Sequence, residues 1–286
     1  MNAPRVSIYM TVKNGAPWVS DAIKSILNQT FSSWEFIIVD DGSNDDTPRI
    51  LQSFARLDSR IRVIFTEGIG RGPALNLALK HARAPYVANI DADDLSHPQR
   101  LEIELNALQK YPSFALIATD GIVFSEQQEI HWLSFQENEF HVFDITDQLM
   151  LFNPVLHSSV MIAREAVLAV GGYNEKLKSN LDYDLWVRLA TAGFRLGLLN
   201  LRLIGKRIHS HQSYETGRHL RYVLSGIRIQ HQAIRNNRAP KRLKLKAWLF
   251  LFLRIGWGLL PKRIRLLFAK RRQQFSISAH QANYSA

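Results

Sequence analysis

Three carboxylates crowd the end of an apolar run in the segment YVANIDADDLSHP: Asp91, Asp93 and Asp94. Like charges at this spacing raise one another's pKa unless a cation lies between them, and a helix cap needs only one carboxylate. The EF-hand calcium loop is a poor match, because its sixth position requires glycine and holds Ser96, although Glu102 fits its twelfth. The pattern favours oxygen ligation of Mg²⁺ or Mn²⁺ together with the phosphates of a nucleotide, where the cation stabilises a departing diphosphate.

Two other acidic segments admit both a structural and a chemical interpretation. The motif DDGS at 40–43 has the composition of a turn, but it follows the strand-like run WEFIIVD, where a carboxylate can accept hydrogen bonds from a base or a ribose. Asp182 and Asp184 open the helix-like segment DYDLWVRLATAG, and carboxylates there gain about 0.3–1 kcal/mol from the helix dipole. In the chemical interpretation, Asp182 is a general base that takes a proton from an acceptor hydroxyl.

Basic side chains form a second set of candidates. The segment EGIGRGPALN does not fit the dinucleotide motif G-x-G-x-x-G, and it predicts instead a turn whose Arg71 reaches toward phosphate. Arg207, His209 and His211 follow one another at a spacing of two, which places them on one face of a strand as candidate metal or phosphate contacts. An exposed arginine and a structural histidine are the ordinary alternatives.

The elements that must position these groups alternate along the chain. The strand-like runs VSIYMTV, WEFIIVD, IRVIFT and YVANI are separated by helix-like segments, one beginning at Thr47-Pro48 and another covering about Pro73 to His81. This alternation predicts an α/β fold with a parallel, doubly wound sheet, in which the loops TVKNG, DDGSNDD and DADD open on one edge. A later block adds a strand-like run, VLHSSVMIA, and a helix from about Leu181 to Ala192.

Composition bounds the class of protein. A chain of 286 residues with 46% hydrophobic residues can bury a sizeable core. It has no cysteine, which excludes disulfides and thiolate sites, so any metal must use carboxylates or histidines. The N-terminal segment MNAPRVSIYMTVKN lacks the long apolar stretch of a signal peptide, and we therefore expect a cytoplasmic protein.

The net charge of +11 is concentrated toward the C-terminus. Residues 216–286 carry 16 of the 36 basic residues and no acidic one, which leaves 20 basic and 25 acidic residues, a net charge of −5, on residues 1–215. The apolar run from Ala247 to Leu260 is shorter than the roughly 20 residues that span a bilayer, and basic clusters flank it. These features predict a segment that lies on an anionic membrane surface, with a helix packed on the main domain as the alternative. Nucleic acid is not expected as a partner, because apolar residues interleave the charges.

The chain resembles the family-2 glycosyltransferases of the GT-A fold from Val6 to about Ser213. The resemblance rests on the order and spacing of VSIYMTVKNG, SILNQTFSSWEFIIVDDGSNDDT, GPALNLALKHARAPYVANIDADD, HSSVMIAREAVLAVGGYNE and DYDLWVRLATAG. It implies inverting transfer of a hexosyl or N-acetylhexosaminyl group from a nucleotide-diphosphate sugar to an acceptor hydroxyl, with Mn²⁺ or Mg²⁺. With a membrane-associated tail, it implies a lipid-linked glycan acceptor in lipopolysaccharide, capsule or exopolysaccharide assembly, at the inner face of the cell membrane.

The resemblance also implies roles for individual residues. Asp182 is the expected catalytic base. The donor is expected to bind Thr11, Asp40, Asp41, Asp91 and Asp93, and the cation Asp93, Asp94 and His209. Arg71, predicted from its own segment to reach toward phosphate, is added to the donor-binding residues. Relatives commonly carry Glu-Asp where this chain has Leu181-Asp182, so that one member of an acidic pair is missing here.

We predict three parts: a GT-A glycosyltransferase domain over residues 1–215, a basic helical membrane-associating extension over 216–272 and a disordered tail over 273–286. Two other functions stay open at this point. A nucleotidyltransferase has the same fold class and metal requirement, and a catalytically silent membrane-tethered scaffold is compatible with Leu181. Release of nucleoside diphosphate instead of pyrophosphate separates the two enzymes, and metal-dependent donor hydrolysis separates an enzyme from the scaffold.

Overall fold

The chain forms two compact units, Met1–Arg238 and Ala239–Ala286. The structure is a computed structural model that describes residues 3–125, 128–135, 140–209, 219–237 and 239–259. The division between the units follows α7 (His219–Asn236), whereas the sequence places the end of the main domain at residue 215. The functional limits at 215 and 272 stay predictions, and the tail over 273–286 lies outside the described residues.

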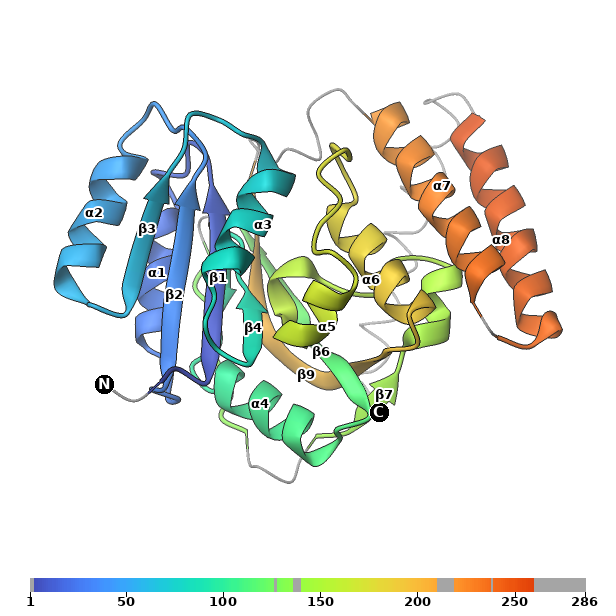
Figure 1. The fold of residues 1–286 in the computed structure, drawn as a ribbon, viewed down its shortest axis with the longest axis horizontal. Helices are drawn as coiled ribbons and strands as arrows, with labels where there is room; N and C mark the ends of the chain where they lie inside the picture. The colour runs from blue at the N-terminus through green and yellow to red at the C-terminus, as the bar shows by residue number, and fades with distance from the viewer. Residues whose placement is uncertain (1–2, 126–127, 136–139, 210–218, 238, 260–286) are drawn as a thin grey trace, which may run out of the picture. The chain divides into compact units, whose positions relative to one another are not determined.

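In the described part of the first unit, nine strands form one sheet (Figure 1). The strands are β1 (Val6–Val12), β2 (Trp34–Asp40), β3 (Ile61–Phe65), β4 (Tyr86–Asn89), β5 (Leu95–Ser96), β6 (Phe114–Ser125), β7 (Val142–Asp144), β8 (Val160–Ala163) and β9 (Arg195–Ile208). Their order is β3-β2-β1-β4-β8-β6-β9-β5, with β7 paired to β9. The first four strands pair in parallel, but β8 is antiparallel to both β4 and β6. The predicted parallel sheet is therefore confirmed for β1 to β4, and the sheet as a whole is mixed.

Helices connect the strands and pack on the sheet. They are α1 (Val19–Leu27), α2 (Thr47–Leu57), α3 (Arg71–His81), α4 (Arg100–Lys110), α5 (Arg164–Ala169) and α6 (Leu181–Thr191), with 3-10 helices η1 (Thr146–Met150) and η2 (His157–Ser159). α3 packs on β1 and β2, α4 packs on β6 and β8, and α6 packs on β9. The helices that the sequence predicts near Thr47, Pro73 and Leu181 are confirmed to within two residues.

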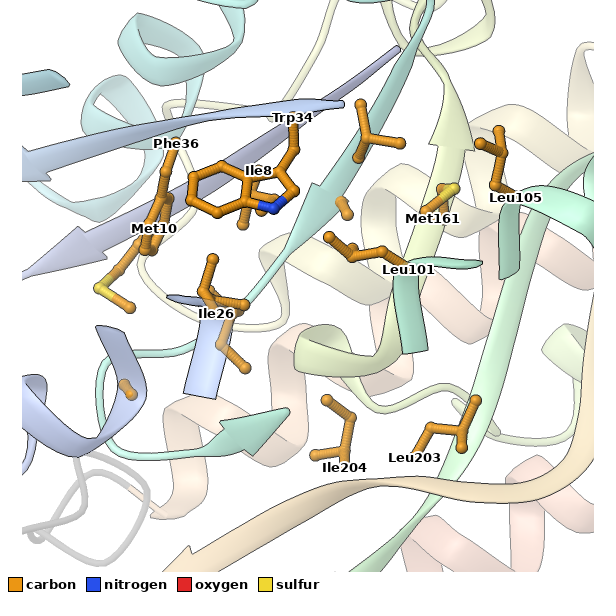
Figure 2. Close-up of a cluster of buried hydrophobic side chains, with 14 of the residues drawn as sticks. Ile8, Met10, Ile26, Trp34, Phe36, Leu101, Leu105, Met161, Leu203 and Ile204 are labelled. Atoms are coloured by element: carbon orange, nitrogen blue, oxygen red, sulfur yellow. The ribbon is translucent and has the colours of Figure 1, made fainter. Parts of the chain in front are cut away.

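The core lies between the sheet and the helices α1 and α4. Alternate residues of a strand point to opposite faces, so Ile8 and Met10 of β1 point to one side, where they pack with Ile26 of α1 and Leu101 of α4 (Figure 2). Each such side chain contributes about 1.5–3 kcal/mol when it is fully buried. Tyr9 points to the opposite face, which α3 covers, and this alternation explains why a polar hydroxyl can stand within a buried strand.

A buried ion pair fixes the sheet where the DADD loop emerges. Arg100 of α4 and Glu104 pair at 2.9 Å, and both side chains are fully buried. The Nη2 group of Arg100 also donates to the carbonyl oxygens of Asn89 and Val160, at 2.9 and 3.1 Å. These carbonyls end β4 and begin β8, so one side chain holds the two antiparallel strands in place. Burial raises the pKa of Glu104 to about 7, although the charge of Arg100 opposes the shift.

The predicted strand VLHSSVMIA is correct only for its second half. β8 begins at Val160, and the three residues before it form η2. The Ser159 backbone N–H and hydroxyl both donate to the carbonyl oxygen of Leu156, at 3.0 and 2.9 Å. Such local hydrogen bonds compete with pairing to a neighbouring strand. As a result, His157 and Ser158 point to the polar site described below.

The second unit contains one described helix, α8 (Lys241–Leu259). Its large exposed apolar residues are Leu245, Leu249, Phe250, Phe252 and Leu253. Residues 245, 249 and 252 recur at the spacing of one helical face, and Lys241, Arg242 and Lys246 of the same helix are exposed as well. Among the described residues, no helix has both the length and the apolar content that a membrane crossing requires.

Candidate active site

The loop after β4 brings its three carboxylates together. One oxygen from each of Asp91, Asp93 and Asp94 lies within 4.8 Å of the others. Because β4 pairs with β1 and β1 with β2 in parallel, this loop and the loops after β1 and β2 share one edge of the sheet, as predicted. The cluster offers the hard oxygen ligands that Mg²⁺ and Mn²⁺ prefer.

Asp94 is the buried member of the cluster. Its Oδ2 accepts a short hydrogen bond from the Ser158 hydroxyl, and its Oδ1 accepts the backbone N–H of Arg207 at 3.1 Å. Burial, together with the charges of Asp91 and Asp93, raises the pKa of Asp94 to about 8. A carboxylate such as Asp94, whose ionisation is opposed by two neighbouring carboxylates, fits a divalent cation, because the cation offsets the repulsion that Asp91 and Asp93 impose.

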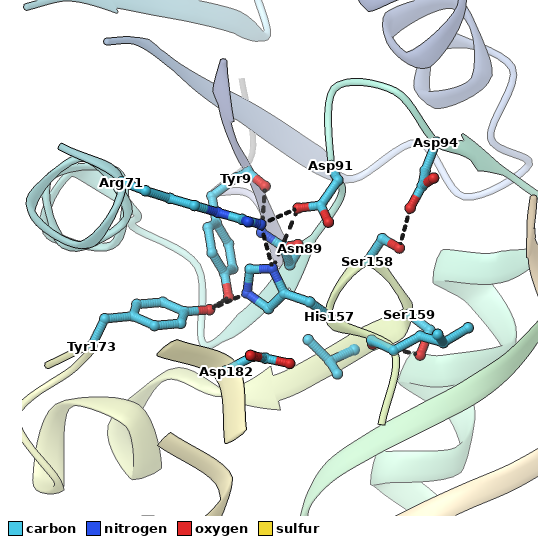
Figure 3. A network of polar contacts seen from close by, with 12 residues as sticks. Tyr9, Arg71, Asn89, Asp91, Asp94, His157, Ser158, Ser159, Tyr173 and Asp182 are labelled. Atoms are coloured by element: carbon cyan, nitrogen blue, oxygen red, sulfur yellow. Dashed lines mark hydrogen bonds and ion pairs between the residues drawn. The ribbon is translucent and has the colours of Figure 1, made fainter. Parts of the chain in front are cut away.

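Asp91 is paired with positive and polar groups on its other side (Figure 3). Its Oδ1 lies 3.0 Å from Nη2 of Arg71 and 3.3 Å from Nδ1 of His157. Burial alone raises the pKa of the Asp91 carboxyl, but the Arg71 guanidinium and His157 outweigh it and hold the pKa well below its usual range. Asp91 therefore stays ionised while Asp94 resists ionisation, which gives two nearby carboxylates different chemical characters.

Asp93 contacts the end of β9. The Nε2 atom of His209 lies 3.0 Å from Oδ2 of Asp93, and the His209 ring stacks on Trp18 with the ring centroids 3.8 Å apart. The Arg207 guanidinium donates to the Asp93 carbonyl oxygen at 3.1 Å and to Asp21 at 3.2 Å. The predicted placement of 207 and 209 near the carboxylates thus agrees with the structure, while His211 lies outside the described residues.

Asp41 links the loop after β2 to the start of α3. Its Oδ1 accepts the hydroxyl of Thr66 at 2.9 Å, and its Oδ2 accepts the backbone N–H of Gly70 at 3.0 Å. Gly70 stands at the N-cap of α3 with φ 97°, a left-handed conformation that favours glycine. The first helical residue after it is Arg71, so Asp41 fixes the position from which Arg71 reaches Asp91.

Thr11 and Asp40 stand on neighbouring strands at the same edge. Asp40 ends β2 as a buried residue, and its Oδ1 accepts the backbone N–H of Ser43 at 2.9 Å, which forms the tight turn of the DDGS motif. Thr11 is the last but one residue of β1 and is half-buried opposite Val39 of β2. Both residues are near the end of the sheet where the carboxylates gather, and their contacts with a donor stay predictions.

Asp182 lies in the first turn of α6, with one carboxylate oxygen held in place. Its Oδ2 accepts the side-chain N–H of Asn153 at 2.8 Å. In the view of Figure 3, Asp182 lies below His157 and Asp91 lies above it. The charge of Asp182 acts on both Arg71 and Tyr173. The preceding Leu181 is buried, and a Cβ added to Gly72 of α3 would lie 3.3 Å from it. Leu181 therefore packs α6 onto α3.

Four residues between η1 and α6 that were not predicted from the sequence contact the site: Asn153, His157, Ser158 and Tyr173. Each contacts a predicted site residue, or a residue that does, from a segment between η1 and α6. His157 and Ser158 were present in the quoted motif HSSVMIA, and the one available signal was a histidine directly before two serines in an otherwise apolar run. The prediction of a regular strand over that run assigned no role to the histidine.

The amino-acid sequence matches a family model described as "Glycosyl transferase family 2" over residues 7–169, more than half of the chain. The chain belongs to glycosyltransferase family 2. This family-2 enzyme is 31% identical over 222 residues to an uncharacterized glycosyltransferase of Rickettsia prowazekii, a match that covers 75% of this chain and 67% of the relative. It is 28% identical to EpsE of Bacillus subtilis, which carries the name of a glycosyltransferase, over 84% of this chain and 85% of that one. Chondroitin synthase of Escherichia coli is 30% identical over 66% of this chain, which corresponds to 27% of its own length.

Solved structures support the GT-A fold of this family-2 glycosyltransferase. The mannosyltransferase PcManGT from Pyrobaculum calidifontis, solved with GDP-Man and Mn²⁺, has a TM-score of 0.70 at 20% identity and covers 100% of this chain and 82% of its own. TarS 1–349 of S. aureus, solved with UDP-GlcNAc, has a TM-score of 0.69 at 17% identity, over 87% and 72%. The predicted fold class and enzyme class are therefore confirmed, and family membership favours glycosyl transfer over nucleotidyl transfer.

Proposed function

We propose that this glycosyltransferase uses a nucleotide-diphosphate sugar and a divalent cation, and transfers the sugar to an acceptor hydroxyl with inversion. The observation that carries the proposal is that the charges of Asp91, Asp182 and Asp93 all act on the Arg71 guanidinium and raise its pKa, so the candidate base and two carboxylates of the candidate cation site lie around one side chain. Nucleotide sugars bound to TarS and PcManGT, and the Mn²⁺ of PcManGT, support the same chemistry for a chain of this fold.

The cation is assigned to Asp93, Asp94 and His209. Asp93 is the more accessible carboxylate, with 30% of its side chain exposed, and His209 already contacts it. Asp94 keeps lone pairs available beyond the two hydrogen bonds that it accepts, since an ionised carboxylate has about four acceptor sites. A bound Mn²⁺ or Mg²⁺ supplies charge that stabilises the departing diphosphate. The nucleotide-sugar panel described below, run with each ion separately, distinguishes Mn²⁺ from Mg²⁺.

The donor is assigned to the loops after β1, β2 and β4 and to the start of α3. Thr11, Asp40 and Asp41 lie at the edge where the base and the ribose are expected. Arg71 and Asp91 form an ion pair that is half exposed on the arginine side, so a ligand can reach it. Asp93 completes the donor contacts through the ribose or the cation. Charged side chains that are already oriented by one another lose little freedom when a ligand binds.

Asp182 is assigned as the base of a single displacement. The acceptor oxygen attacks the anomeric carbon as the bond to the diphosphate oxygen breaks, and the nucleoside diphosphate leaves with the bonding electrons. Asp182 takes the hydroxyl proton, for which its Oδ1 is the available oxygen because Asn153 occupies Oδ2. Attack from the side opposite the leaving group inverts the anomeric configuration.

The acceptor is assigned to lipid-linked glycans of surface polysaccharide assembly, at the cytoplasmic face of the cell membrane. The support comes from the C-terminal segment, in which α8 combines exposed apolar residues with exposed lysine and arginine, and in which residues 216–286 contain no acidic residue. Such a helix suits an anionic membrane surface without crossing it.

A panel of nucleotide sugars tests the proposal. Release of nucleoside diphosphate is scored with Mn²⁺ or Mg²⁺ for the wild type, for Asp182→Asn and for Asp93→Asn, with Glu165→Gln as an exposed acidic control on α5. We expect release from at least one donor by the wild type and the control, and loss in both site variants. Equal release by Asp182→Asn would contradict the assigned base. Absence of release with any donor, even with membrane extract as acceptor, would favour the silent scaffold.

A further inference from the structure

A chain of three side chains runs from the buried face of β1 to the donor site (Figure 3). The hydroxyl oxygens of Tyr9 and Tyr173 lie 2.7 Å apart, and the Tyr173 oxygen lies 2.7 Å from Nε2 of His157. On its other side, Nδ1 of His157 lies 3.3 Å from Oδ1 of Asp91. Both tyrosines are buried, so bulk water does not supply their hydrogen-bond partners.

The hydrogen atoms along this chain can be assigned. Burial raises the pKa of Tyr9 and of Tyr173 above the ordinary value, so each phenol keeps its hydrogen and must donate it. Within the described part of the chain, the hydrogen-bond acceptor recorded for the Tyr9 hydroxyl is the oxygen of Tyr173. When Tyr9 donates to Tyr173, Tyr173 donates onward to Nε2 of His157. His157 then carries its own hydrogen at Nδ1, facing Asp91.

If the hydrogen bonds ran in the opposite direction, from His157 toward Tyr9, a buried hydroxyl group would be left without an acceptor. If Nε2 of His157 carried the hydrogen, it would donate to Tyr173, Tyr173 would donate to Tyr9, and the Tyr9 hydrogen would have no recorded acceptor among the described residues. An unpaired buried hydroxyl is costly. Arg71 by itself favours this opposite direction, because its Nη2 lies 3.3 Å from Nδ1 of His157 and can donate only to an Nδ1 that carries no hydrogen. The same Nη2 also donates to Asp91 at 3.0 Å and the Arg71 side chain is 50% exposed, so losing that contact costs less than leaving the buried Tyr9 hydroxyl without an acceptor.

We propose that Tyr9 and Tyr173 are positioning residues that hold His157 in the Nδ1–H tautomer, so that His157 and Arg71 together orient the Asp91 carboxylate for the donor sugar. Both donors use Oδ1, and Oδ2 is the oxygen left for a sugar hydroxyl. The assignment of a donor to Asp91 rests on the proposed function, whereas the tautomer of His157 is a property of the protein without ligand.

Nuclear magnetic resonance of ¹⁵N-histidine-labelled protein tests the tautomer directly. The spectrum is recorded without donor, at a pH well above the ordinary histidine pKa of about 6.5, and the His157 signals are assigned from their loss in His157→Asn. We expect a protonated Nδ1 and an unprotonated Nε2. Tyr173→Phe removes the donor to Nε2 and is expected to shift His157 toward the other tautomer or a mixture, while Tyr111→Phe leaves it unchanged. An Nε2–H tautomer in the wild type would overturn the proposal.

Two substitutions of His157 test the consequence for the donor. Asparagine places an amide near the position of Nδ1, so His157→Asn retains a donor to Asp91, whereas His157→Gln places its amide near Nε2. We expect KM for the donor identified by the panel to rise about tenfold more in His157→Gln than in His157→Asn. The Kd of the matching nucleoside diphosphate is expected to change less than about twofold in both, since that ligand lacks the sugar.

The two measurements separate the inference from the proposed function. If the panel finds no donor, the proposed function fails, but the NMR result still decides the tautomer. If His157→Asn loses as much donor affinity as His157→Gln while the wild type shows Nδ1–H, the orienting role for the sugar is overturned and the hydrogen-bond chain is structural. If both variants weaken nucleoside diphosphate binding equally, His157 acts on the fold of the site and the proposal is also overturned.

Discussion

Asn153 donates an amide hydrogen to Oδ2 of Asp182 across 2.8 Å, and it comes from a segment 29 residues earlier in the chain. In the proposed mechanism, this contact leaves the second oxygen of Asp182 to accept the proton of the acceptor hydroxyl. Asn153→Ala should therefore lower kcat about tenfold or more, because the base loses its orientation, without a comparable change in the Kd of nucleoside diphosphate. Steady-state kinetics and nucleotide titration measure the two quantities. In an Asp182→Asn background, the same substitution should add little, and additive losses would exclude action through Asp182.

Cation binding should stabilise the protein through Asp93. A ligand at a hundredfold excess over its Kd adds about 2.7 kcal/mol to the free energy of unfolding, and a cation bound at the cluster should raise Tm accordingly. Asp93→Asn removes a charged ligand that is 30% exposed and is expected to abolish most of the shift caused by MnCl₂. Thermal denaturation with MnCl₂ and with a chelator measures this shift in Tm. Glu165→Gln should show the same shift as the wild type. An undiminished shift in Asp93→Asn would place the cation elsewhere.

The buried Arg100–Glu104 pair should make stability depend on pH. Burial raises the pKa of Glu104 from 4.5 to about 7, so in the folded protein this carboxyl holds its proton more tightly than in the unfolded chain. The stability that comes from this tighter proton binding at Glu104 is complete below about pH 4.5 and is lost as pH rises to about 7. Glu104→Gln keeps a group of similar shape that does not titrate. The free energy of unfolding of Glu104→Gln, relative to that of the wild type, should rise between about pH 4.5 and 7 by a few kcal/mol at most. If the two free energies changed in parallel with pH, the raised pKa of Glu104 would be contradicted.

Membrane association should depend on the apolar face of α8. Leu249→Glu with Phe252→Glu places two acids among exposed apolar residues of that helix and should abolish flotation with vesicles that contain phosphatidylglycerol. Leu57→Glu, at a residue of α2 that is 80% exposed, is the matched control and should leave flotation unchanged. Wild-type binding should weaken as salt rises, because anionic lipids attract the basic residues. Absence of wild-type flotation would contradict the membrane assignment.

The parallel pairing of β1 to β4 and the grouping of the carboxylates followed from the sequence, because these depend on local patterns. Runs such as WEFIIVD are apolar throughout and predict buried parallel strands, and parallel strands bring their following loops to one edge. Leu181, by contrast, fills space against α3, and the sequence indicated a missing acid without indicating that packing.

The partners of the predicted site residues could not be predicted in the same way. His157 lies 66 residues from Asp91, and Tyr173 lies 164 residues from Tyr9, so the contacts depend on how β8 and α6 pack against the first half of the sheet. A single sequence carries no signal for which distant polar side chain faces which carboxylate. The serine hydrogen bonds that replace the first half of the predicted strand by η2 also turn His157 toward the site, and period-two patterning misses that change.

The anomeric configuration of the product tests the proposed mechanism, because a single displacement with Asp182 as the base permits one outcome. The product formed from the donor that the panel identifies is examined by proton NMR at early times, before the free sugar can equilibrate. We predict a configuration opposite to that of the donor sugar, and loss of this product in Asp182→Asn. Retention of the donor configuration would contradict the proposed mechanism, because attack from the side opposite the leaving group cannot give it.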